Sequence, residues 1–171
     1  GFYVTDNLFA EVGLRFSMFN YMGPGKVYRY RDGASISDHN ITDSTMYARN
    51  EIIKAWGGPE PRISLRYTIA DRSSVKIGYN RIYQYLHLIT NTAAVTPVDV
   101  WQSANTYFKP QIGDQVSAGY YRNLGENMFE AFVEGYVKYT RNILDFKDGA
   151  DLLLNPRLET ALLSGVGTAH G

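Results

Sequence analysis

The stretch that decides the fold runs from Leu8 to Tyr21 and reads LFAEVGLRFSMFNY. Its even-numbered positions up to Met18 are all apolar, whereas its odd-numbered positions carry a glutamate, a glycine, an arginine and a serine between two phenylalanines. A period of two sustained over this length predicts a β-strand with one apolar and one polar face. Such a strand exceeds the usual length of about five or six residues and reaches the roughly 9–11 residues that a tilted strand needs to cross a bilayer.

The same alternation recurs along the chain, so we expect an all-β fold built as an antiparallel meander. The strands are expected near residues 8–20, 62–70, 74–86, 113–121 and 128–142, and the C-terminal residues from Gly165 would start a sixth. Within 74–86 the tyrosines share a face with Arg81. The alternation then fails over residues 82–89. Either a bulge that resets the register or departure of the strand from the sheet would explain this failure.

The connections between these strands differ in length. Residues 70–74 and 122–127 predict short turns, whereas long external loops are expected near 22–60, 90–110 and 143–164. Short turns at one end and long loops at the other are typical of outer-membrane β-barrels, and loops of this length are unusual in a compact soluble domain. Five strands and a stub cannot close a barrel in lipid. We therefore expect residues 1–171 to be a fragment of one larger transmembrane β-barrel domain.

Composition excludes several classes of protein. The 171 residues carry 17 Lys+Arg against 17 Asp+Glu, which argues against nucleic acid as a partner. There is no cysteine, so disulfide scaffolds and thiolate metal sites are excluded. The three histidines lie far apart, and no residue pair has the spacing of a nucleophile with its base. We expect no catalytic residue, cofactor or metal, and no enzyme activity.

Two sets of side chains are candidates for contact with a ligand or partner. The first set consists of charged residues on the polar faces of the expected strands, which would point into the barrel interior: Glu11, Arg15, Arg62, Arg66, Lys76, Glu130, Glu134 and Lys138. These residues would contact substrate, or would form an ion-paired, hydrated wall. The second set consists of aromatic residues in the expected loops: Tyr28, Tyr30, Tyr47, Trp56, Trp101, Tyr107 and the adjacent Phe108. These residues would contact a ligand, or would pack ordered loops together.

Four local motifs resemble segments of the TonB-dependent outer-membrane transporters, in particular the SusC-like receptors of Bacteroidota. They occur in the family's order: FAEVGLRFS at 9–17; PEPRISLRY at 59–67 with VKIGYNR at 75–81; FKPQ at 108–111 followed by Gln115 and Gly119; and YVKYTRNI at 136–143. The third motif departs from the family's Leu-Lys-Pro-Glu pattern, because Gln111 replaces the glutamate.

The resemblance implies the C-terminal part of a plugged barrel of roughly 22 strands in the outer membrane of a Gram-negative cell. It implies nutrient import (a glycan, peptide or metal chelate), contact with the lipid bilayer and lipopolysaccharide, and TonB bound through a plug domain that is absent from this sequence. A SusD-like surface lipoprotein or a larger envelope complex would be a further partner. Two alternatives stay open: a barrel of the same family that is a structural subunit of an envelope assembly or secretion complex, and a soluble β-domain that binds carbohydrate or protein.

Overall fold

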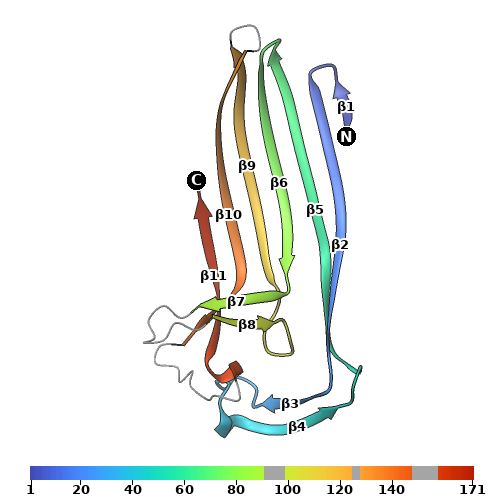
Figure 1. Cartoon of the computed structure of the whole chain (residues 1–171), viewed down its shortest axis with the longest axis vertical. Coiled ribbons are helices and arrows are strands. Elements are labelled where there is room, and N and C mark those ends of the chain that lie inside the picture. The colour runs from blue at the N-terminus through green and yellow to red at the C-terminus, as the bar shows by residue number, and fades with distance from the viewer. Residues whose placement is uncertain (91–98, 125–127, 148–157) are drawn as a thin grey trace.

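The structure is a computed structural model that describes residues 1–90, 99–124, 128–147 and 158–171. The chain is nearly all β, which confirms the expected fold class of an antiparallel meander. Seven strands form the main sheet in the order β1-β2-β5-β6-β9-β10-β11 (Figure 1). They are β1 (Phe2–Thr5), β2 (Leu8–Met22), β5 (Ile52–Ala70), β6 (Ser73–Gln84), β9 (Gln111–Leu124), β10 (Phe129–Phe146) and β11 (Leu162–His170).

Two hairpins lie outside this sheet, both at its lower end in Figure 1. One pairs β3 (Gly25–Tyr30) with β4 (Ile41–Tyr47), and the other pairs β7 (Leu86–Thr90) with β8 (Asp99–Ser103). Two 3-10 turns complete the elements, η1 (Asp38–Asn40) and η2 (Leu158–Thr160). We call this the hairpin end and the opposite one the turn end. At the turn end β5 and β6 are joined through Asp71 and Arg72 alone.

The expected loop over residues 22–60 is wrong, because it contains β3, β4 and the first part of β5. The sequence around Pro59 and Pro61 reads as a loop, yet both prolines lie within β5 and pair with β2. The β5–β6 ladder begins only at Arg62 opposite Asn80, so the prolines occupy a part of β5 that has a partner on one side. Proline in strands is confined to such one-sided segments, because between two partner strands it would remove a ladder hydrogen bond.

The failed alternation over 82–89 marks the point where the chain leaves the main sheet. The strand expected over 74–86 ends at Gln84, and β7 then forms its own hairpin with β8. His87 is buried, whereas Leu86 and Leu88 are half-exposed. Departure from the sheet, not a bulge within it, therefore explains the loss of the pattern.

The other expected loops are also partly wrong. The loop expected over 90–110 contains β8, and the one over 143–164 contains the end of β10 and the start of β11. Residues 91–98 and 148–157 of these loops lie outside the described residues. The expected sixth strand is a full one of nine residues. The short β1 has no counterpart in the sequence-based prediction.

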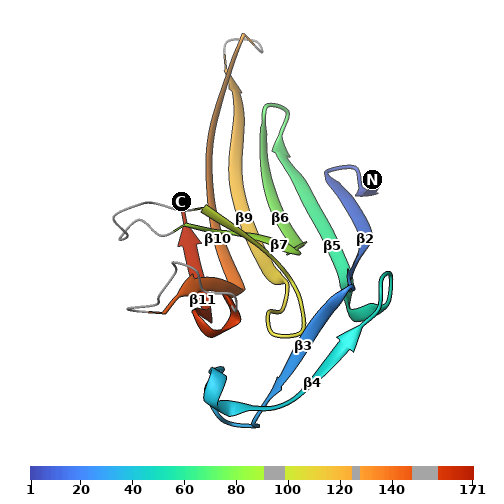
Figure 2. The same ribbon diagram turned by 60° about the horizontal axis from the view of Figure 1, so that its bottom comes forward.

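The hydrophobic core of the described chain is small and lies at the hairpin end (Figure 2). Its members come from β7, β10, β11 and the segment after β8: Ile89, Phe108, Leu144 and Leu162, with Tyr107 and Phe146 packed against them. Along the rest of the main sheet, no described element packs as a second layer on either face. The sheet thus presents two open faces over most of its length.

Candidate functional site

The strand register divides the main sheet into an apolar face and a polar face. Directly paired residues share a face, and the register aligns Val12 with Ile63, Ile63 with Tyr79, Tyr79 with Val116 and Val116 with Val137. This row crosses five strands on one side of the sheet. The alternation in each strand therefore combines into one continuous surface.

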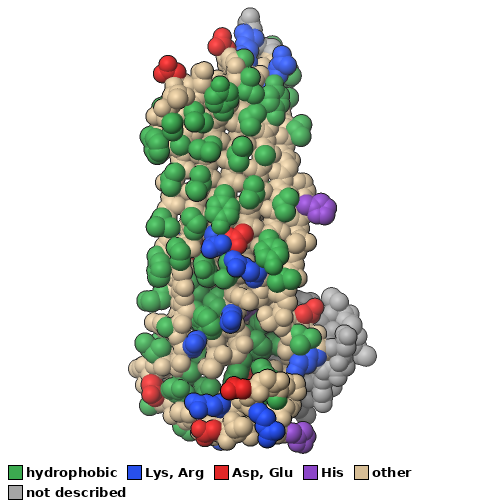
Figure 3. All heavy atoms as spheres, turned by 180° about the vertical axis from the view of Figure 1, so that it is seen from behind, with side chains coloured by type: hydrophobic (Ala, Val, Ile, Leu, Met, Phe, Trp, Pro, Cys, Tyr) green, Lys and Arg blue, Asp and Glu red, His purple; other side chains and the backbone are tan. Residues whose placement is uncertain are grey.

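The apolar face is highly exposed. The exposed fraction is 75% for Leu14, 70% for Phe16 and 76% for Val133. Figure 3 shows this face as a broad hydrophobic surface that is interrupted by a compact group of charged side chains. An apolar surface of this extent is unusual on a soluble monomer and indicates a face that is covered by an apolar partner or solvent.

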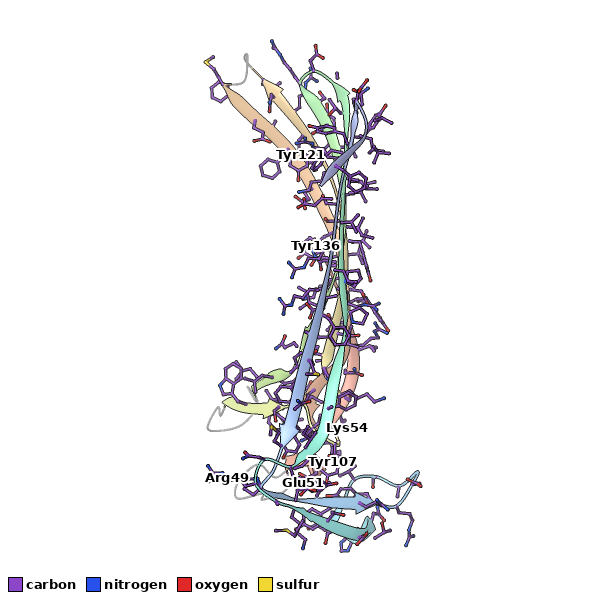
Figure 4. All side chains as sticks on the ribbon, turned by 90° about the vertical axis from the view of Figure 1, so that its right-hand side faces the viewer. Arg49, Glu51, Lys54, Tyr107, Tyr121 and Tyr136 are labelled. Carbon is purple, nitrogen blue, oxygen red and sulfur yellow. The ribbon has the colours of Figure 1, made fainter. Side chains whose placement is uncertain are left out.

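The opposite, polar face carries the charged residues that we selected from the sequence. The register brings onto this one face all eight candidates: Glu11, Arg15, Arg62, Arg66, Lys76, Glu130, Glu134 and Lys138. Tyr121 and Tyr136 lie on it too, within the long span of the sheet in Figure 4. The Tyr121 hydroxyl donates a hydrogen bond to Glu134 over 2.8 Å.

Two adjoining open hollows lie on the polar face, with volumes of about 380 Å³ and 300 Å³. Both are lined by Glu11 and Lys76, the first also by Arg62 and the second by Arg66 and Glu130. Among the described residues these five charged side chains form no ion pair with one another. Both hollows are open, so water can reach these charges of both signs, which suits side chains without an ion-pair partner.

Glu60 marks the end of the polar face and was not among our candidates. Its side chain is fully buried, and its Oε1 accepts hydrogen bonds from the Ser17 hydroxyl at 2.9 Å and the Tyr83 N–H at 3.1 Å. Oε2 lies 3.0 Å from Arg15 Nε in an ion pair whose geometry is not that of a hydrogen bond. Glu60 thereby ties β2, β5 and β6 together where β6 leaves β5.

A charged cluster interrupts the apolar face at the ends of β6, β9 and β10. We call it the Asp114 cluster; it consists of Tyr79, Arg81, Asp114 and Arg141. Asp114 Oδ1 lies 2.6 Å from Arg81 Nε and accepts a hydrogen bond from the Tyr79 hydroxyl at 2.8 Å. Its Oδ2 lies 2.9 Å from Arg141 Nη2. One carboxylate thus holds two guanidinium groups together.

The sequence signal for this cluster was incomplete. Arg81 stands out as a charge on an apolar strand face, but only the register shows that Asp114 lies directly opposite it. Arg141 lies on the same face, two positions beyond Tyr139, which pairs with Asp114. Three charges that seem isolated in the sequence are therefore neighbours.

Three of the loop aromatic candidates meet at the hairpin end. The Tyr107 hydroxyl accepts a hydrogen bond from the Tyr28 N–H and donates one to the Tyr28 carbonyl, both over 2.7 Å. The Tyr30 ring packs edge-on against the Tyr107 ring, with centroids 5.6 Å apart. Figure 4 places Tyr107 at this end of the molecule. These contacts favour a packing role for the three tyrosines.

The other aromatic candidates are dispersed. Trp56 Nε1 donates a hydrogen bond to the backbone carbonyl of Asn105 over 3.0 Å, and Trp101 is largely exposed in β8. Tyr47 is half-buried in β4, and Phe108 belongs to the core. Asn105 itself was missed: it is buried, and its Oδ1 accepts hydrogen bonds from the N–H groups of Tyr107 and Phe108.

Burial shifts two titratable groups at the hairpin end. It raises the pKa of the Tyr107 phenol, against the opposing effect of the hydrogen bond with Tyr28. It lowers the pKa of His87, against the opposing effect of a hydrogen bond with the Lys109 backbone. Both groups are therefore kept neutral by their surroundings.

Among the described residues, no group of three or more His, Asp or Glu side chains is placed to hold a metal ion. No helix in the same residues is long and apolar enough to span a membrane.

Comparison with models of protein families, with curated proteins and with solved structures finds no match to this chain.

Proposed function

We propose that this chain forms part of the wall of an outer-membrane β-barrel that imports a nutrient with energy from TonB. One observation carries the proposal: a single continuous sheet has an exposed apolar face and an opposite face that carries charged side chains. In a barrel wall the first face contacts lipid and the second faces an aqueous interior.

Strand length supports a membrane span over a soluble sandwich. β2, β5 and β10 contain 15, 19 and 18 residues, several times the strand length typical of soluble domains. The two ends of the sheet also differ as barrel ends do, with short turns at one and hairpins at the other. By this asymmetry the turn end is periplasmic and the hairpin end is extracellular.

The edges of the sheet support the proposal that more strands complete the barrel. Within the part of the chain that the structure describes, β1 pairs with β2 only from Leu8 to Ala10, and β11 pairs only with β10. Unpaired backbone N–H and C=O groups are too costly in hydrocarbon to remain open. Strands outside this sequence are therefore needed on both sides.

The importer assignment rests on the resemblance of the four motifs to TonB-dependent transporters. The hollows on the polar face suit a hydrated interior that contacts a plug or substrate. A SusD-like lipoprotein at the extracellular end and TonB at the periplasmic end are the partners that this assignment entails. A structural subunit of an envelope complex would have the same wall without TonB.

The membrane part of the proposal is tested with spin labels at two adjacent positions of β10. The full-length protein carries either Val137→Cys or Lys138→Cys in a cysteine-free background and is reconstituted into liposomes. We expect oxygen from the bilayer to relax the label at 137 and a water-soluble nickel complex to relax that at 138. Equal access of the nickel complex to both labels would identify a soluble domain instead.

The importer part needs a separate experiment. Photo-crosslinking of the full-length protein in intact envelopes should give an adduct with TonB. A correctly inserted barrel that gives no such adduct, under conditions where a known TonB-dependent receptor does, would contradict import and leave a structural role.

A further inference from the structure

We propose that the Asp114 cluster binds a phosphate group of a lipid headgroup in the outer leaflet. The inference rests on the proposed membrane barrel and assigns one specific site on its apolar face. The occupant is a phosphate that is attached to acyl chains.

The cluster has more positive charge than its own carboxylate balances. Asp114 is the only acidic member, and both of its oxygens are engaged by the two arginines. Arg81 is bound through Nε, and no hydrogen bond from its terminal nitrogens occurs within the described residues. Arg141 is bound through Nη2, and no hydrogen bond from its other terminal nitrogen occurs within the described residues. The side chains stay accessible, with exposed fractions of 30% for Arg81 and 40% for Arg141.

The position of the cluster along the strands fits one surface of the hydrocarbon layer. Arg122, near the periplasmic turn, lies on the same face as Asp114 and eight positions away in β9. Between them this face carries only Tyr120, Ala118 and Val116. Eight residues span about 26 Å along a strand, or about 20 Å along the membrane normal at a tilt of about 40°. That length approaches the apolar band of roughly 25 Å in outer-membrane barrels.

At this position the cluster meets lipid headgroups and not the hydrocarbon of the bilayer. Charges within hydrocarbon are costly, whereas at the interface they meet anionic headgroups and water. The cluster lies on the hairpin side of the apolar stretch, which is the extracellular side of the proposed barrel. Tyr79 belongs to the cluster and Tyr139 lies beside it on the same face, and tyrosine is favoured at this depth.

Phosphate suits the free donors of the cluster. A guanidinium group offers parallel N–H donors that match two phosphate oxygens, and Asp114 holds two such groups side by side. Acyl chains that extend from the phosphate toward the periplasmic side would run along Val116 and Ile77, which are both exposed. A lipid-borne phosphate thus satisfies the charge and the apolar surface together.

The test uses the full-length protein in a non-ionic detergent, with lipid A as the probe. Native mass spectrometry measures the binding of lipid A with two phosphates and of lipid A from which both phosphates have been removed. We expect the phosphorylated form to bind at least about tenfold more tightly, since charged hydrogen bonds to the phosphate are lost without it. The Arg81→Gln/Arg141→Gln variant should lose this preference.

A matched control removes the same charge from the opposite face. The Lys76→Gln/Lys138→Gln variant should keep the wild-type preference for phosphorylated lipid A. A second variant, Arg81→Lys/Arg141→Lys, keeps the charge and removes the guanidinium fork. This lysine variant should bind phosphorylated lipid A with intermediate affinity. It takes the place of the glutamine variant in the binding measurement if the glutamine variant does not fold.

Three results would overturn the inference. The first is equal binding of both lipid forms by the wild-type protein. The second is an unchanged preference in both arginine variants. The third is displacement of lipid A by an equal concentration of inorganic phosphate, which would show that the acyl chains are not required.

If the arginine variants instead dissociate a protein oligomer and leave lipid binding intact, the cluster is a subunit interface. A protein that stays dispersed in water without detergent contradicts the proposed barrel itself, whereas the results above concern the cluster alone.

Discussion

The Tyr107 hydroxyl makes two hydrogen bonds with the backbone of Tyr28, one accepted from the N–H and one donated to the C=O, each over 2.7 Å. The two residues are 79 positions apart. Tyr28 also pairs with Ser44 of β4, so the Tyr107 side chain supplies backbone hydrogen bonds of the kind that a further neighbouring strand would make. It fastens the β3–β4 hairpin to the segment that follows β8, and so joins two connecting segments at the hairpin end.

Replacing Tyr107 by phenylalanine should release the β3–β4 hairpin. Both hydrogen bonds are lost and the Tyr28 backbone groups are left without this partner, so the expected loss is about 1–3 kcal/mol of local stability. Hydrogen exchange at the amides of β3 measures the effect. Tyr67→Phe on the apolar face is the control and should leave exchange in β3 unchanged. Equal protection of β3 in both variants would show that the hydroxyl does not hold the hairpin.

Replacing Asn105 by alanine should disorder the segment that carries Tyr107. The side-chain oxygen accepts the N–H groups of Tyr107 and Phe108 at 2.8 and 2.9 Å, and both lose their partner in the variant. We expect a loss of about 1–3 kcal/mol. Trp56, which is bonded to the Asn105 carbonyl, reports the change through its fluorescence. An unchanged Trp56 emission and melting curve would contradict this role of Asn105.

Replacing Glu60 by alanine should destabilise the protein more than replacing an exposed glutamate. The variant leaves the Tyr83 N–H and the Ser17 hydroxyl without the buried acceptor, at a cost of about 1–3 kcal/mol for the unsatisfied groups. The temperature at which the protein loses its compact, heat-modifiable band on a gel should fall. Glu134→Ala, on the exposed part of the same face, is the matched control. Equal shifts for the two variants would mean that burial of Glu60 adds nothing.

The hairpin end should become less stable in mild acid because of His87. Burial lowers the pKa of His87 in the folded state below its ordinary value of 6.5, so the unfolded hairpin binds a proton more readily. The stabilisation is therefore complete above about pH 6.5 and is lost as the pH falls toward and through the folded-state pKa. Hydrogen exchange of β7 between pH 7.5 and 5, corrected for the intrinsic rate, should reveal this loss of protection.

Two variants make the pH experiment specific. His87→Phe removes the titrating group and should flatten the pH dependence of protection in β7. His39→Gln changes an exposed histidine in η1 and should keep the wild-type profile. If His87→Phe shows the same acid sensitivity as the wild-type protein, another group is responsible.

Prediction from the sequence succeeded for the central parts of the long strands and for their two faces. It failed where a strand contains loop-forming residues, as at Pro59 and Pro61, and where a strand changes sheet after Gln84. The structure places the eight charged candidates on one face, as the alternation indicated. Glu60 and Asn105 were not predicted from the sequence. The burial of Glu60 depends on β6, and that of Asn105 depends on the segment that carries Tyr107.

The sequence by itself determined where the central parts of the long strands lie and which of their side chains share a face. Both follow from the period of two, which is a local property of the backbone. Only the tertiary structure decided which residues of different strands lie opposite one another. The register brings together Arg81 of β6, Asp114 of β9 and Arg141 of β10. The first and last of these are 60 positions apart in the sequence. The register between strands depends on the turn lengths and on all neighbouring strand pairs at once, so a local sequence pattern does not predict it.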